Sequence, residues 1–107
     1  MPSMSSHDDR SLDAVFRALA DSTRRLILEE LAHRDRQPLF EICVRMIEQH
    51  QLSLSRQAIS KHLAVLEDAG LVTTEWEGRT KLHSSRLAVT ADHITAWLNA
   101  HSKRQPS

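Results

Sequence analysis

The chain has 107 residues, a length that predicts a single domain, and its formal net charge is zero. Hydrophobic residues make up 40% and charged residues 26%, the balance of an ordinary globular protein. A lone cysteine, Cys43, excludes an intramolecular disulfide, and no apolar run approaches the roughly 20 residues that a membrane-spanning helix needs. With no signal-peptide pattern at the N-terminus, we expect a cytoplasmic protein.

The zero net charge conceals an asymmetry along the chain. Residues 1–52 hold seven Lys or Arg and nine Asp or Glu, a balance of −2, whereas residues 53–107 hold seven and five, a balance of +2. Nucleic-acid-binding proteins usually carry a basic excess, so the total argues mildly against such a partner. Whether the chain can bind nucleic acid depends on where its cations lie on the surface, and the net charge does not decide it.

Two amphipathic helices are predicted after a disordered tail at residues 1–10. Apolar residues spaced i, i+3, i+4, i+7 predict the first helix, which ends near Ala20: Leu12, Val15, Phe16 and Leu19. Asp21 or Ser22 is suited to cap the second helix. Its buried stripe is expected to be Ile27, Leu28 and Leu31.

Two further helices follow a polar connector at Arg34–Pro38. The third helix is expected to bury Phe40, Cys43, Val44 and Ile47. After a polar turn at Gln49–Ser53, Ser55 is a capping residue for the fourth helix. The inner stripe of the fourth helix is Ile59, Leu63 and Leu66. Gly70 stands where a helix C-terminus favours a left-handed residue.

The pattern then changes to the alternation of strands. Val72–Trp76 and Thr80–Ser84 are predicted to form a hairpin around a turn at Glu77–Arg79. Thr90 is expected to cap a last helix with an apolar face of Ile94, Trp97 and Leu98, and residues 103–107 to form a second tail. The expected domain, residues 11–102, is mainly α with a small β-hairpin, in the order α-α-α-α-β-β-α of a winged helix-turn-helix.

The fourth predicted helix carries a polar face that is suited to DNA. Arg56, Gln57, Ser60 and Lys61 fall opposite the apolar stripe and in the first two turns, where a recognition helix contacts bases. His62 lies at the edge of this face, and Ser55 can offer a phosphate its backbone amide. On the hairpin, Arg79 and Lys81 are candidates for phosphate contacts. An ordinary solvated face would show the same residue types.

Three segments resemble the ArsR/SmtB (arsenical-resistance-repressor-like) family of winged helix-turn-helix regulators. They are Val15–Leu31, Leu54–Val72 and the hairpin tip Glu77–Arg79, within a similarity that spans roughly residues 12–87. The resemblance implies a bacterial homodimeric repressor, released from its operator by a signal, whose subunits pair through the first and last helices. The residues expected at that interface are Leu12, Val15, Phe16, Leu19, Ile94, Trp97 and Leu98.

Metal sensing, common in that family, is not expected here. Its sensors commonly carry a Cys-x-Cys pair in the third helix, where this chain has Cys43 followed by Arg45. The last helix also lacks the family's ligand spacing, since Asp92 and His93 are adjacent and His101 comes eight residues later. We therefore predict no metal and no cofactor. A metal- or redox-gated repressor using Cys43 or His93/His101 remains an alternative.

The expected function is a homodimeric, sequence-specific repressor that binds double-stranded DNA at an imperfect inverted repeat. Repressors of this kind often control their own operon, but the sequence does not identify the regulated genes. No phosphate-binding loop, nucleophile elbow or paired metal-binding helix motif points to an enzyme. The alternative from another class is a winged-helix module that binds proteins without reading DNA. Whether a small-molecule inducer exists is left open by the sequence.

Overall fold

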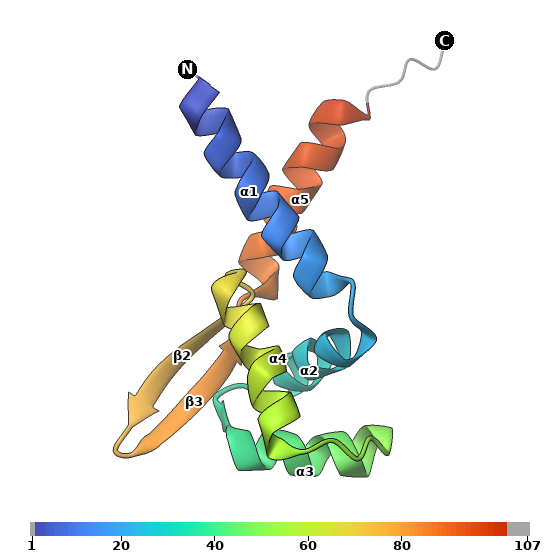
Figure 1. Cartoon of the computed structure of the whole chain (residues 1–107), viewed down its shortest axis with the longest axis vertical. Helices are drawn as coiled ribbons and strands as arrows, with labels where there is room; N and C mark the ends of the chain where they lie inside the picture. Colours follow the sequence, from blue (N-terminus) through green and yellow to red (C-terminus); the bar gives the residue numbers. More distant parts are fainter. Residues whose placement is uncertain (1, 103–107) are drawn as a thin grey trace.

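The computed structural model describes residues 2–102, with side chains described for residues 11–102. Five helices and a small sheet follow one another along this part of the chain (Figure 1). Their bounds are α1 Pro2–Leu19, α2 Ser22–His33, β1 Gln37–Pro38, α3 Leu39–His50, α4 Arg56–Asp68, β2 Val72–Glu77, β3 Thr80–Ser85 and α5 Leu87–His101. The structure therefore confirms a mainly α fold with a hairpin between the fourth and fifth helices.

The core lies where α2, α3 and α4 meet the base of the hairpin. Its side chains are almost entirely aliphatic, because the chain is only 4% aromatic. The largest fully buried apolar residues are Ile27, Leu31, Ile42, Met46, Ile59, Leu66 and Leu71. Removal of this surface from water provides the main driving force that holds the three helices together.

The hairpin joins a third, short strand to form an antiparallel sheet in the order β1-β3-β2. β2 and β3 pair from Val72↔Ser85 to Glu77↔Thr80, and Gln37 pairs with His83. Gly78 supplies the positive φ of 65° that the tip requires. The sequence predicted the hairpin but read Gln37–Pro38 as a connector, because two residues are too few to show alternation.

The helix ends agree with the sequence at three places, Asp21, Ser55 and Gly70, and differ at a fourth. Asp21 caps α2 by accepting hydrogen bonds from the backbone amides of Thr23 and Arg24, and Gly70 adopts a positive φ of 80° after α4. Thr90, however, does not cap the last helix. α5 begins at Leu87 after Arg86, and Thr90 is a buried residue inside it. The prediction missed the first turn, where the N-cap residue Arg86 makes no capping hydrogen bond and Ser85 Oγ accepts from the amide of Leu87 at 3.1 Å.

The predicted inner stripe of α3 was mostly wrong. Phe40, Val44 and Ile47 are exposed, and the buried residues are Ile42 and Met46. Apolar residues cover more than half the circumference of this helix, so their spacing alone was consistent with either face. Packing against α2 and α4 selects the face that is buried, and Cys43 lies at its edge, half-buried.

α1 begins at Pro2, about ten residues before the predicted start. The backbone of residues 2–10, which we expected to form a tail, is helical. Proline suits the first turn of a helix, and no Gly or Pro interrupts the chain between Ser3 and Leu19. The other predicted tail, residues 103–107, lies outside the described residues. Within residues 2–102, no helix combines the length and the apolar character needed to cross a membrane.

Candidate nucleic-acid interface

α4 is fixed at its start by a cap and along its length by the core. Ser55 has extended backbone angles, and its Oγ accepts a hydrogen bond of 3.0 Å from the backbone amide of Ala58. Ile59, Leu63 and Leu66 point into the core. Burial of these three side chains fixes the rotation of α4 about its own axis, and so defines which of its residues face solvent.

The opposite face of α4 is polar and exposed. Arg56, Gln57, Ser60 and Lys61 are all exposed, as the sequence predicted. Arg and Lys donate hydrogen bonds to guanine edges or phosphates, and the Gln amide matches an adenine edge. This face therefore offers a donor and acceptor set that fits a DNA groove.

His62 does not belong to that face. Its ring is half-buried against α2, where Nδ1 lies 3.3 Å from Nη1 of Arg24. The same guanidinium donates to the carbonyl of Ala18 at 2.8 Å and to that of Arg17 at 3.1 Å. His62 thus helps to connect α4 to the junction of α1 and α2, a role that the sequence did not indicate.

The hairpin carries the two predicted cations in different settings. Arg79 is exposed at the tip, whereas Nζ of Lys81 lies 3.8 Å from Oε1 of Glu67 on α4. The other oxygen of Glu67 accepts a hydrogen bond of 3.0 Å from the Thr74 hydroxyl. Glu67 therefore ties both strands of the hairpin to α4, a link that the sequence analysis did not identify.

A second residue missed by the sequence analysis fixes the hairpin from the other side. Arg36, in the connector before β1, has a positive φ of 55°. Its Nη2 lies 3.3 Å from a carboxylate oxygen of Glu75 and 3.2 Å from one of Glu77, both on β2. The acidic side chains of β2 are thus turned toward Arg36.

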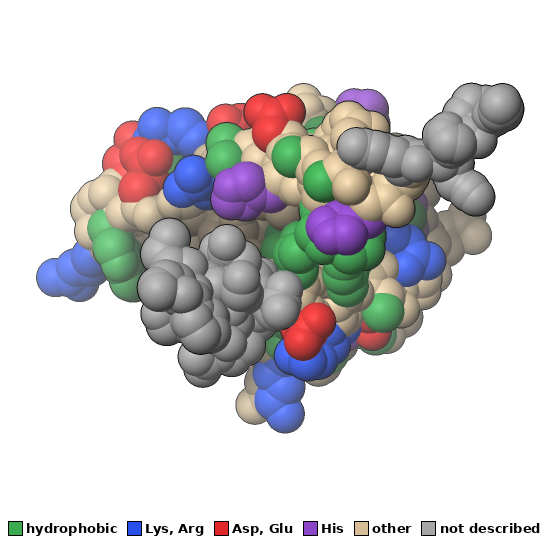
Figure 2. Space-filling view, turned by 90° about the horizontal axis from the view of Figure 1, so that it is seen from above, with side chains coloured by type: hydrophobic (Ala, Val, Ile, Leu, Met, Phe, Trp, Pro, Cys, Tyr) green, Lys and Arg blue, Asp and Glu red, His purple; other side chains and the backbone are tan. Residues whose placement is uncertain are grey.

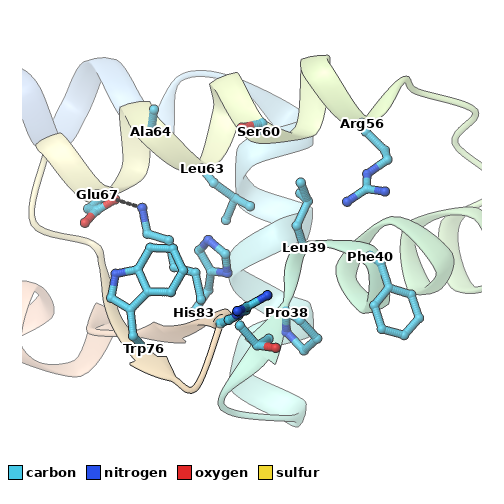
Figure 3. Close-up of a pocket in the computed structure, with 13 residues that line it drawn as sticks. Pro38, Leu39, Phe40, Arg56, Ser60, Leu63, Ala64, Glu67, Trp76 and His83 are labelled. Carbon is cyan, nitrogen blue, oxygen red and sulfur yellow. Dashed lines mark ion pairs between the residues drawn. The ribbon is translucent and has the colours of Figure 1, made fainter.

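An open groove of about 410 Å³ lies between α4, the hairpin and the start of α3 (Figure 3). The groove brings together four of the predicted site residues: Arg56, Ser60, Arg79 and Lys81. Ser55, Gln57 and Lys61 do not line it. The exposed face of α4 and the tip of the hairpin therefore form one continuous candidate surface that extends over two elements.

The candidate ligands for a gating metal lie in separate places. Burial raises the pKa of the Cys43 thiol, and the nearby charge of Arg56 only partly opposes this. The neighbouring Arg45 donates from Nε to Glu30 at 2.8 Å. On α5, Nδ1 of His101 lies 2.9 Å from the Trp97 carbonyl oxygen. Among the described side chains, no three His, Cys, Asp or Glu residues gather into a metal-binding group.

The residues predicted at a dimer interface lie around the crossing of α1 and α5, and Figure 2 looks onto this end of the molecule. Phe16, Trp97 and Leu98 are 43%, 40% and 50% exposed. A hollow of about 590 Å³ between the two helices is lined by further apolar side chains, including Leu12 and Ile94. Leu19 is half-buried and Val15 is buried, so Val15 packs within the monomer's own core.

Taken together, α2, α3, α4 and the hairpin define a winged helix-turn-helix protein. A family model described as a helix-turn-helix domain matches residues 19–75, more than half of the chain. The matched segment contains α2, α3, α4 and most of β2, so it includes the proposed recognition helix.

Curated relatives carry the same assignment. YuzN of Bacillus subtilis, an uncharacterized HTH-type transcriptional regulator, is 56% identical over 70 residues, which are 65% of this chain and 76% of YuzN. The transcriptional repressor SdpR of the same organism is 30% identical over 92 residues, 86% of this chain and 94% of SdpR.

Solved structures agree in fold. An ArsR-like transcriptional regulator from Rhodococcus sp. RHA1 has a TM-score of 0.60 and 30% identity over 89% of this chain and 96% of its own. The homodimeric winged helix-turn-helix domain of Mb0332 from Mycobacterium bovis has a TM-score of 0.65 and 20% identity. The match covers 92% of this chain and 87% of the Mb0332 domain. The chain described here belongs to the ArsR family of helix-turn-helix transcriptional regulators, which are not enzymes.

Proposed function

We propose that this regulator is a homodimeric repressor that binds an imperfect inverted repeat in DNA, its own operator included, and blocks transcription from it. The observation that carries the proposal is the exposed face of α4, where Arg56, Gln57, Ser60 and Lys61 stand opposite a buried stripe. A helix held in this way can enter a major groove without disturbing the core.

The hairpin complements this helix. Arg79 at the tip contacts a DNA backbone phosphate beside the major groove that α4 occupies. Lys81 contacts a phosphate too, once its ion pair with Glu67 is broken. The helix N-terminus at Ser55 adds backbone amides for another phosphate. Base contacts from α4 supply the sequence preference, and these phosphate contacts set its position on the duplex.

Dimerisation follows from the exposed apolar residues of α1 and α5. Phe16, Trp97 and Leu98 remain exposed in the monomer, and a second subunit would remove them from water. The homodimeric Mb0332 domain and the repressor SdpR support the assembly and the direction of regulation. Two recognition helices on one side of a duplex fit half-sites about 34–36 Å apart, and so an inverted repeat. The site of action is the cytoplasm, where the operator is found.

Selection of bound sequences from a random DNA pool tests the proposal, followed by a salt titration on the selected site. We expect an inverted repeat and a fall in log K with log salt whose slope is about −0.9 for each phosphate neutralised. A scrambled duplex of equal length is the control. If binding is weak, flat with salt and equal on both duplexes, the chain is a protein-interaction module and the proposal is wrong.

A further inference from the structure

The groove between α4 and the hairpin has the character of a small-molecule site as well as that of a DNA surface. Its walls are largely apolar, formed by Leu39, Phe40, Leu63 and Trp76 (Figure 3). Trp76 is 66% exposed and stands on β2 between Glu75 and Glu77. Ligand sites in proteins combine such apolar walls, a volume of a few hundred Å³ and a few polar groups.

The charges around the groove are unbalanced. Three cations line it, Arg56, Arg79 and Lys81, against the single carboxylate of Glu67, which leaves an excess of two positive charges. That carboxylate is already engaged by Lys81 and by the Thr74 hydroxyl. An anionic group entering the groove would therefore meet two arginines whose charges nothing else in the groove offsets.

A buried histidine supplies a further polar group. His83 is only 7% exposed, and its ring points from β3 toward the groove in Figure 3. Nδ1 lies 3.0 Å from the carbonyl oxygen of Gln37, which can only accept, so Nδ1 carries the hydrogen. Nε2 is then the unprotonated nitrogen, which can only accept a hydrogen bond, and it has no partner among residues 11–102.

We propose that this groove binds a flat apolar organic anion, of the chemical class of aromatic carboxylates, and that this anion and DNA exclude each other. Its ring packs against Trp76 and its carboxylate meets Arg56 and Arg79, whereas the unprotonated Nε2 of His83 is open only to a donor group on the ring. The exclusion rests on the proposed function, because Arg56, Ser60, Arg79 and Lys81 also belong to the proposed DNA surface. Reciprocity then requires that the anion weaken DNA binding as much as DNA weakens the anion's binding.

Binding of the anion is tested without DNA, by NMR on the ¹⁵N-labelled full chain with 1-naphthoate as the probe. The two tryptophans give two indole N–H signals, and each lines a different hollow of the molecule. We expect 1-naphthoate to shift the Trp76 signal and to leave that of Trp97 unchanged. The isosteric neutral 1-naphthamide should bind at least tenfold more weakly. A shift at Trp97 alone, or equal binding of the amide, would overturn the proposal.

Two variants localise the site on the same chain. Trp76→Ala removes an exposed indole, so the fold should persist, and we expect 1-naphthoate affinity measured by calorimetry to fall at least tenfold. Ile47→Ala removes an exposed apolar side chain of α3 outside the groove and should leave that affinity unchanged. Equal losses in the two variants would mean that the probe binds apolar surface in general, and the proposed site would be wrong.

Exclusion is tested by fluorescence anisotropy on the selected operator. Saturating 1-naphthoate should weaken DNA binding at least fivefold in the wild type, with 1-naphthamide at the same concentration as the control. In Trp76→Ala the anion's effect on DNA binding should disappear. If 1-naphthoate shifts Trp76 but leaves operator affinity intact, the exclusion is wrong. If the chain binds the anion but no DNA, the proposed function fails and the binding site stands.

Discussion

One side chain, Arg24, connects three helices through a single guanidinium group. It donates to carbonyls at the end of α1, approaches Asp21 at the start of α2 and meets His62 on α4. The position of the recognition helix therefore depends on residues about 40 positions away in the chain. Asp21 is the partner in this set that also caps a helix.

Asp21→Ala should lower the free energy of unfolding by about 1 kcal/mol, the usual cost of losing a helix cap. Asp21→Ser keeps a capping oxygen and should recover most of that loss. Urea denaturation monitored by circular dichroism measures both variants. Equal stability of wild type and Asp21→Ala would show that the cap contributes nothing.

The pH dependence of this cap follows from the direction of its pKa shift. Burial alone raises the pKa of Asp21, but the amide of Arg24, the charges of Arg24 and His62 and the amide of Thr23 together hold it below its ordinary value. The stabilisation is present above the ordinary pKa and is lost as pH falls through the lowered one. The stability difference between wild type and Asp21→Ser should therefore shrink in acid.

Arg56 is the residue on which the proposed DNA contact depends most. Arg56→Ala should weaken operator binding by about 1–3 kcal/mol if the side chain reads a guanine. If it contacts only phosphate, the loss should be smaller and equal on all sequences. Anisotropy with operator and scrambled duplexes distinguishes the two, and Arg34→Ala, which removes an exposed arginine paired with Glu41, is the charge-matched control. Unchanged binding of a folded Arg56→Ala/Lys61→Ala variant would contradict the assignment of α4.

At the scale of elements, an ion pair between a buried carboxylate and a partly exposed arginine holds α3 against α2. The Glu30 side chain is 4% exposed, and its carboxylate accepts from Nε of Arg45 at 2.8 Å, with Nε2 of His50 3.9 Å away. The hydrogen bond to Glu30 raises the pKa of Arg45. Arg45, which by sequence was only an obstacle to metal binding, is thus a structural residue.

The two partners of this pair should respond unequally to substitution. Glu30→Gln leaves Arg45 able to reach water and should cost on the order of 1–3 kcal/mol of unfolding free energy. Arg45→Ala should cost more, because it leaves a carboxylate buried without its main partner. Glu29→Gln, at an exposed neighbouring position, is the control and should change little. Urea midpoints that rank Glu30→Gln as the more damaging change would contradict this.

At the scale of the molecule, the exposed apolar residues on α1 and α5 predict assembly. We expect the wild type to sediment as a dimer at micromolar concentration. Trp97→Ala should weaken the dimer and operator binding together, since tight binding needs both half-sites, whereas Trp76→Ala should leave the dimer intact. A monomeric wild type that still binds an inverted repeat tightly would contradict the proposed interface.

Metal ions should have little effect on the assembled protein. Stoichiometric zinc, cadmium or arsenite should change operator affinity less than threefold, or by under about 0.7 kcal/mol. The reason is chemical, since a single half-buried thiol and two exposed α5 histidines provide too few converging ligands. Anisotropy in a non-chelating buffer is the measurement. A tenfold loss that Cys43→Ser or His93→Ala/His101→Ala abolishes would show that ligands assemble across the dimer.

The sequence by itself determined the features that depend on near neighbours in the chain. Helical spacing, the caps at Asp21 and Ser55, the turn at Gly78 and the exposed face of α4 all arise within about one or two turns of backbone, where spacing and residue type are sufficient. These features, with the family resemblance, predicted the order of the helices and the hairpin, without β1, and the four exposed polar residues on the face of α4.

Only the tertiary structure decided which of two possible faces is buried and which distant residues meet. The apolar surface of α3 is wide enough that its spacing does not define the buried side. Contact with α2 and α4 places Ile42 and Met46 in the core. The contacts of His62 with Arg24, Lys81 with Glu67 and Arg36 with the strand β2 each join residues from different elements. Such pairings depend on how helices and strands pack in space, and chain spacing carries no information about a partner that lies beyond the next turn.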